Sequence, residues 1–202
     1  GVQTCALPIY FASDYNELIE IAVRRRNEGA SEILLGEEVF ARFQSIMRSN
    51  LKFAAGASLA SIDKLVANEV AMFHALGTDS KGFCLKLLGK DQQPGVAVPP
   101  DHIKRLMQLG TLYRFEAIVD GTNRSQTSEP LTKPELEAFQ ASLAFDGMNV
   151  DEVQSGAFLS KDGSEPGQPC LMIERLYRAV GRLADAPRRK LYVSLFFAGR
   201  DN

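Results

Sequence analysis

The chain has 202 residues, of which 45% are hydrophobic and 24% are charged, and its formal net charge is −2. This length allows one domain, or at most two small ones, with a sizeable core. The nearly balanced charge excludes a strongly basic nucleic-acid-binding protein, and no apolar run approaches the roughly 18 residues that indicate a membrane-spanning helix.

The first nine residues, GVQTCALPI, resemble the in-frame translation of a common sequencing-library adapter. They contain no basic region of the kind that opens a secretory signal peptide, and Pro8 interrupts their apolar stretch. We therefore interpret residues 1–9 as a non-native segment and expect order to begin near Tyr10. On this interpretation Cys5 leaves the cysteine count, and the sequence is a truncated fragment. Any signal peptide or membrane anchor, and with it any membrane association, would then belong to a missing upstream segment.

Residues 10–202 are predicted to form a single all-α domain, an irregular bundle of about seven or eight short helices. The first helix is expected over residues 14–27, with Ser13 or Asp14 as its cap and Gly29 behind its end. In the next helix the apolar residues recur at helical spacing, namely Val39, Phe40, Phe43, Ile46 and Met47.

The clearest helical pattern is SLASIDKLVANEVAMFHALG, residues 58–77, with Gly77 as its expected stop. A short helix, KGFCLKLLG, follows it. The next helix has Pro100 in its first turn and is apolar around much of its circumference, which is typical of a central helix. Residues 120–132 are polar and rich in turn-forming residues, so we expect a loop there or a boundary between two sub-bundles.

Four further helices are expected in the rest of the chain. A capping box at Thr132 opens KPELEAFQASLAF, and a short helix is expected near NVDEVQSGAFL. The helix CLMIERLYRAVGRLADA follows, and Pro187 is expected to start the last helix, RRKLYVSLFFAG.

Cys84 and Cys170 each stand near the start of a predicted helix, in line with apolar residues, so both are expected to face the interior. Three interpretations remain open. In the first interpretation the two thiols are unlinked and act as small apolar side chains. In the second they form a structural disulfide, which would indicate an oxidising compartment. In the third interpretation one of them is a reactive thiol, although no C-x-x-C motif is present.

The segments GFCLKLL and QPCLMIERLYRAVGRLADAPRRKLYVSLFFAG together resemble an uncharacterised helical domain of proteobacterial envelope proteins, often found behind a membrane segment. The resemblance covers about residues 57–199 and depends on Cys84, Cys170 and the helix that contains LYRAV. It implies an extracytoplasmic location and a bond between Cys84 and Cys170. It implies no known activity.

Motifs that carry chemistry are scarce. The sequence has no H-x-x-x-H, H-E-x-x-H or G-x-S-x-G motif and no glycine-rich phosphate loop, so we predict no metal site and no cofactor. Ser61 and Lys64 form a formal S-x-x-K, which we interpret as the start of a solvated helix. Glu69 is unusual because it falls within an apolar stripe, where a carboxylate needs a partner, and His74 lies beside that stripe.

The favoured hypothesis is a non-enzymatic domain of a periplasmic or envelope-associated bacterial protein, with a scaffold or protein-interaction role and an unidentified protein partner. It expects Cys84 and Cys170 within disulfide distance. The alternative is a cytoplasmic enzyme or small-ligand-binding protein with a polar pocket around Glu69 and His74. That pocket would be lined by four aromatic residues, Phe73, Tyr113, Phe115 and Tyr177. The alternative expects a concave site where Glu69 or His74 meets another polar side chain.

Overall fold

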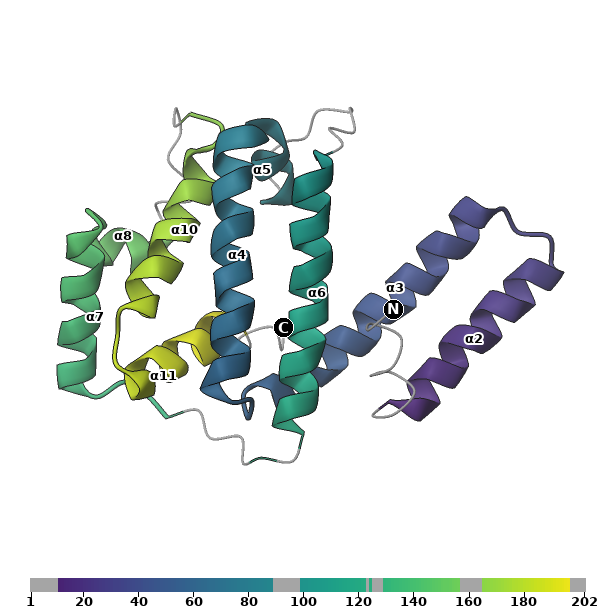
Figure 1. The fold of residues 1–202 in the computed structure, drawn as a ribbon, viewed down its shortest axis with the longest axis horizontal. Helices are drawn as coiled ribbons and strands as arrows, with labels where there is room; N and C mark the ends of the chain where they lie inside the picture. Colours follow the sequence, from purple (N-terminus) through teal and green to yellow (C-terminus); the bar gives the residue numbers. More distant parts are fainter. Residues whose placement is uncertain (1–10, 89–98, 123, 125–128, 157–164, 197–202) are drawn as a thin grey trace. The chain divides into compact units, whose positions relative to one another are not determined.

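The computed structural model describes residues 11–88, 99–122, 124, 129–156 and 165–196. Within these ranges the chain forms nine α-helices and no strand, which confirms the all-α prediction. In the labels of Figure 1 the helices are α2 (Ala12–Asn27), α3 (Glu32–Ala54), α4 (Leu59–Asp79), α5 (Lys81–Leu87), α6 (Asp101–Gly121), α7 (Lys133–Phe145), α8 (Val150–Ser155), α10 (Gln168–Gly181) and α11 (Asp185–Phe196). The prediction that residues 1–9 are non-native falls outside the described residues.

The chain divides into two compact units. Unit 1 contains Gly1–Ser58 and Arg114–Thr127, and unit 2 contains Leu59–Tyr113 and Ser128–Asn202. One change of unit therefore lies within residues 120–132, where the composition predicts a loop or a boundary. Another lies inside the continuous helix α6, which no composition shift marks.

In unit 1, α2 and α3 lie side by side as an antiparallel hairpin (Figure 1). The expected caps of α2, Ser13 and Asp14, are inside the helix, because it begins directly after Phe11. The turn between the two helices contains Gly29 at a φ of 75°, a conformation that glycine adopts without strain. The N-terminus of α3 is capped by the hydroxyl of Ser31, which accepts a hydrogen bond from the amide of Leu34.

The core of unit 1 contains an aromatic cluster. The ring of Phe115 lies 4.9 Å from that of Phe43 and 6.4 Å from that of Phe11, between ring centroids. Phe40 does not join this core, because its side chain is 59% exposed, contrary to its placement in the predicted apolar stripe. Among the described residues of this unit, the buried apolar ones are Phe11, Leu18, Ile46, Met47, Leu51, Ala54, Ala57, Phe115, Ala117 and Ile118.

A close backbone contact holds α3 against the end of α6 in unit 1. A Cβ atom built on Gly121 would lie 1.8 Å from the carbonyl oxygen of Phe53, so only glycine fits there. Nearby, the carboxylate of Asp120 accepts hydrogen bonds from both the amide and the hydroxyl of Ser58, at 2.7 and 2.6 Å. Asp120 also forms an ion pair with Arg124. These contacts fix the chain where it leaves α3.

In unit 2, α4 and α10 pack along each other, and α10 lies between α4 and α7 (Figure 1). The short helix α5 contacts both α4 and α10, and so does α11. The side chains at the centre of this packing are fully buried, among them Ile62, Leu65, Leu76, Leu143 and Val180. The stripe predicted for residues 58–77 is therefore the face that α4 buries.

Gly77 does not end α4, as its position in the sequence suggested, because the helix continues to Asp79. It is instead a point of close approach between α4 and the start of α10. A Cβ atom on Gly167 would lie 2.0 Å from the carbonyl oxygen of Gly77, and a Cβ atom on Gly77 would lie 2.6 Å from the side chain of Leu171. Two glycines far apart in the sequence therefore let two helices approach with their backbones almost touching.

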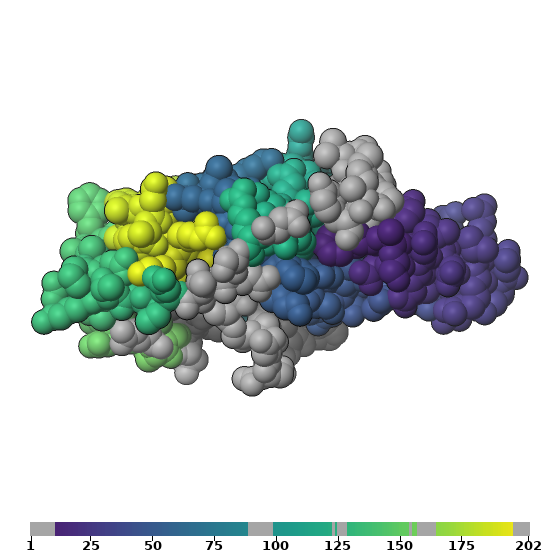
Figure 2. All heavy atoms as spheres, turned by 90° about the horizontal axis from the view of Figure 1, so that it is seen from below, coloured from purple at the N-terminus to yellow at the C-terminus, as the bar shows by residue number. Residues whose placement is uncertain are grey.

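The last helices differ in their bounds from the prediction. α10 ends at Gly181 and α11 begins at Asp185, so Pro187 lies within the first turn of α11, where its missing N–H needs no partner. Helix α7 has the predicted bounds and the predicted capping box, in which Glu135 accepts from the amide of Thr132. Lys190 of α11 pairs with Glu135 at 2.9 Å, and Figure 2 shows the atoms of α11 in yellow beside those of α7 in green.

Candidate functional site

The two cysteines of the sequence prediction lie together in unit 2. Cys84 belongs to α5 and Cys170 to the first turn of α10, and both side chains are fully buried. Their sulfur atoms are 2.06 Å apart and their Cα atoms 6.1 Å apart, so the pair is at disulfide distance. The expectation that both cysteines face the interior is confirmed.

The local fold explains why these two residues meet. The contact between Gly77 and Gly167 brings the first turn of α10 against the end of α4. Helix α5 begins two residues after α4 ends, at Lys81, and places its buried face toward α10. Cys84 follows Gly77 by seven residues and Cys170 follows Gly167 by three, and both side chains point into the core beside the glycine contact. The cysteine pair and the glycine contact therefore form one junction.

Glu69 is 2% exposed and faces α6. Its Oε1 atom would lie 3.1 Å from a Cβ atom at Gly110, so the absence of a side chain at residue 110 leaves room for the carboxylate. The neighbouring Asn68 is also buried, and its side-chain amide donates a hydrogen bond of 2.9 Å to the carbonyl oxygen of Leu106. Glu69 and Asn68 therefore belong to the packing between α4 and the first part of α6.

His74 lies on a different side of α4. Its side chain is 56% exposed, and its Nδ1 atom is 3.0 Å from Oε2 of Glu174 on α10. The other oxygen of Glu174 is 2.6 Å from the guanidinium of Arg178, one helical turn further along. Glu174 is itself 6% exposed, so this buried carboxylate ties α4 to α10 through two partners. Sequence reasoning missed Glu174, although its i, i+4 spacing from Arg178 was a usable signal.

The structure does not bring Glu69 and His74 together. Five residues along an α-helix correspond to about 140° around its axis, so the two side chains point toward different neighbours. One packs beside α6 and the other pairs with α10. Two open surface depressions formed by described residues lie elsewhere, one along α2 and one between α2 and α3.

The four aromatic residues expected to line a pocket take part in separate contacts. The rings of Phe73 and Tyr177 lie 6.1 Å apart between α4 and α10. The amine of Lys64 lies 4.3 Å above the ring of Tyr113, and Phe115 belongs to the aromatic cluster of unit 1. These rings therefore serve packing at three places and do not converge on one cavity.

A polar cluster that the sequence did not indicate lies where α4 meets α11. Arg188 reaches Asp63 at 3.2 Å and Asp185 at 2.9 Å. Tyr192 lies nearby and is 2% exposed. Burial, together with the negative charge of Asp63, raises the pKa of the Tyr192 phenol to about 12. Burial also raises the pKa of Asp63, and Arg188 opposes that shift. This cluster anchors the last helix to α4.

Neither metal binding nor membrane spanning finds support in the part of the chain that the structure describes. Its His, Cys, Asp and Glu side chains form no group of three or more that could hold a metal ion. None of its helices combines the length and the apolar character needed to cross a bilayer.

His102, the other histidine, pairs with Asp79 at 3.1 Å, and hydrogen bonds from Thr78 and His102 lower the pKa of Asp79.

Comparison of the chain with protein-family models, with curated protein sequences and with solved structures found no match. The fold and the residues described above are therefore the basis for the functional proposal, and the resemblance to an envelope domain stays a prediction.

Proposed function

We propose that this protein is a non-enzymatic helical domain of a bacterial envelope protein, located in the periplasm, with a scaffold or protein-interaction role. The observation that carries the proposal is the buried pair of Cys84 and Cys170 at disulfide distance. Disulfides persist in oxidising compartments such as the periplasm and are rare where glutathione and thioredoxin keep thiols reduced.

The position of the pair supports a structural role for the bond. Both sulfur atoms are inaccessible, whereas reactive and redox-sensing thiols are at least partly exposed to their substrates. The bond would link residues separated by 86 positions, which removes much conformational freedom from the unfolded chain. A buried bond that closes a long loop is what an exported domain uses for stability.

The polar residues of unit 2 support a non-enzymatic role. Glu69 sits within helix packing, and Glu174 is engaged by both His74 and Arg178. An active site needs polar groups that converge on a space where a substrate can bind. Here the buried carboxylate of Glu174 joins α4 to α10, and that of Glu69 lies in the packing between α4 and α6.

The test is the redox state and the location of the protein in the cells that produce it. Cells are quenched with acid, the protein is alkylated under denaturing conditions, and the peptides that contain Cys84 and Cys170 are analysed by mass spectrometry. We expect recovery in the periplasmic fraction, with both cysteines alkylated only after reduction. Recovery in the cytoplasmic fraction with two alkylated thiols before reduction would contradict the proposal. A catalytic activity abolished by His74→Ala with the fold retained would contradict its non-enzymatic part.

A further inference from the structure

Exposed apolar side chains are concentrated on the hairpin of unit 1. Among the described residues, nine large hydrophobic side chains are exposed, and five of them lie on α2 and α3: Ile19, Val23, Ile33, Leu34 and Phe40. Ile19 and Val23 are 46% and 53% exposed and stand one turn apart on α2. Clusters of this kind on a protein surface mark interaction sites.

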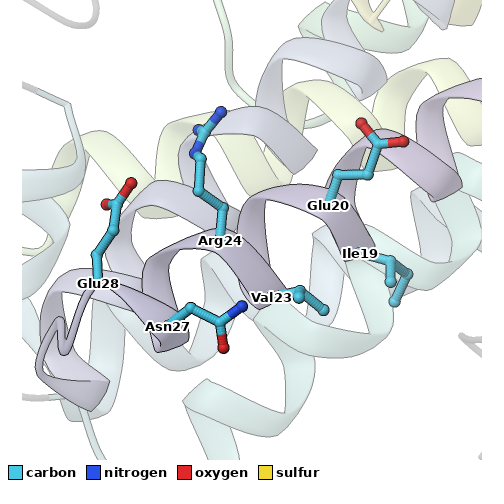
Figure 3. A pocket seen from close by; sticks show the side chains of 6 residues that line it. All are labelled: Ile19, Glu20, Val23, Arg24, Asn27 and Glu28. Carbon is cyan, nitrogen blue, oxygen red and sulfur yellow. The ribbon is translucent and has the colours of Figure 1, made fainter.

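These two residues belong to an open depression along α2, which we call the α2 outer face. It is lined by Ile19, Glu20, Val23, Arg24, Asn27 and Glu28. Figure 3 shows Ile19, Val23 and Asn27 along one edge of the helix and the three charged side chains along the other. The α2 outer face therefore has an apolar edge beside a charged edge, both running parallel to the helix axis.

The charged edge alternates in sign. Glu20 forms no ion pair with any of the residues that the structure describes. Arg24, four residues later, is 60% exposed, and its one ion-pair contact within the described part of the chain is with Glu38, at 3.6 Å. Such an exposed contact contributes little and leaves the guanidinium available to another carboxylate. A negative and a positive group therefore stand one helical turn apart on the same edge.

We propose that the α2 outer face binds the same face of a second copy of this chain, with the two α2 helices antiparallel about a two-fold axis beside residue 22. This symmetry sets Glu20 of each copy level with Arg24 of the other, which forms two equivalent ion pairs. It also places the two Val23 side chains at the centre, next to the axis. The face is self-complementary because its charges change sign across the axis while its apolar residues meet.

The charges of the hairpin favour a second copy over an anionic lipid surface. The three arginines at the end of α2 are followed closely by carboxylates, and Arg25 is already held by Glu28 and Glu38. A membrane-binding hairpin needs an excess of basic residues beside its apolar ones. A contact confined to one helix is at the small end of protein interfaces, so we expect a dimer with a dissociation constant in the micromolar range, about 1–100 μM.

The test is sedimentation equilibrium of the intact chain and its variants across this concentration range. We expect the wild type to dimerise and Val23→Glu to weaken dimerisation at least tenfold. Glu20→Arg and Arg24→Glu should each weaken it by placing like charges opposite one another, and the double variant Glu20→Arg/Arg24→Glu should restore it. Leu195→Glu, a matched change of an exposed leucine in unit 2, should leave dimerisation unchanged.

Two results would overturn the inference. One is a wild-type chain that stays monomeric at about 100 μM. If that monomer also floats with vesicles of phosphatidylserine and phosphatidylcholine, the face binds lipid and not a second copy. The other is a dimer that Val23→Glu, Glu20→Arg and Arg24→Glu all leave intact. Circular dichroism of each variant checks that the helices are retained. The inference rests on the interaction role proposed above, but the two proposals fail separately. A monomer with an oxidised cysteine pair in the periplasm would reject only the dimer. A dimer with reduced thiols in the cytoplasm would reject only the periplasmic location.

Discussion

Removal of the bond between Cys84 and Cys170 should destabilise unit 2, mainly because it increases the conformational entropy of the unfolded chain. The two residues are 86 positions apart, and loop-closure entropy for that separation is about 15 cal/mol/K. At 25 °C this corresponds to about 4.5 kcal/mol of unfolding free energy. A loss of that size should lower the midpoint of thermal unfolding by about 9–18 °C in a chain of this length.

The assay is urea and thermal unfolding followed by circular dichroism, on the wild type and on Cys84→Ala, Cys170→Ala and the double variant. Because either single substitution breaks the same bond, each should lose nearly as much stability as the double variant. A reducing agent such as TCEP should lower the stability of the wild type toward that of the double variant. It should leave the double variant unchanged, which makes that variant the matched control.

The reasoning fails if the loss is additive between the two single variants, or if complete reduction of the wild type, checked by mass, leaves its unfolding midpoint in place. Either result would mean that the cysteines stabilise the protein as separate apolar side chains. The stability lost on substitution would then come from a cavity in the core, which scales with the volume removed and not with the length of the loop.

Three further changes give expectations of different kinds. Gly121→Ala forces a Cβ atom against the carbonyl oxygen of Phe53 and should destabilise unit 1 by about 3 kcal/mol or more in urea unfolding. The control is Gly36→Ala, whose Cβ atom meets no atom within 4 Å and which should stabilise α3 by up to about 1 kcal/mol. Because the pKa of Tyr192 is raised to about 12 in the folded state, its contribution to stability is complete below about pH 10 and is lost as the pH rises toward 12. Tyr192→Phe should flatten this alkaline loss, and an equally steep loss in that variant would assign it to other groups. Asp120→Ala removes the acceptor of an amide and a hydroxyl and should reduce stability by about 1–3 kcal/mol, with a value near zero showing that water replaces the carboxylate.

Much of the fold follows from periodicity. The apolar spacing in residues 58–77 predicted the buried face of α4, and the Thr132 capping box predicted the start of α7, because both signals arise from neighbours one or two turns apart. Gly77 was misread as a helix stop for the same reason. Its role depends on Gly167, ninety residues away, and a local pattern carries no information about such a contact.

The candidate site shows the same limit. That Cys84 and Cys170 face the core follows from their stripes, but their meeting depends on how α10 returns to the end of α4. Glu69 stood out because a carboxylate in an apolar stripe is rare. Glu174 did not, since its burial is created by the helices around it and not by its own neighbours in the sequence. The α2 outer face was not predicted. The sequence of α2 alone does not show that Ile19 and Val23, although apolar, are exposed.

The junction at the start of α10 combines two constraints of different origin within a few residues. Gly77 and Gly167 leave no space for the backbones to move closer, and the sulfur pair prevents α5 and α10 from moving apart. Local opening of unit 2 must therefore start elsewhere. In a native-state hydrogen-exchange experiment the amides just after Cys170 should exchange only through global unfolding, while those at the far end of α10 exchange through smaller openings.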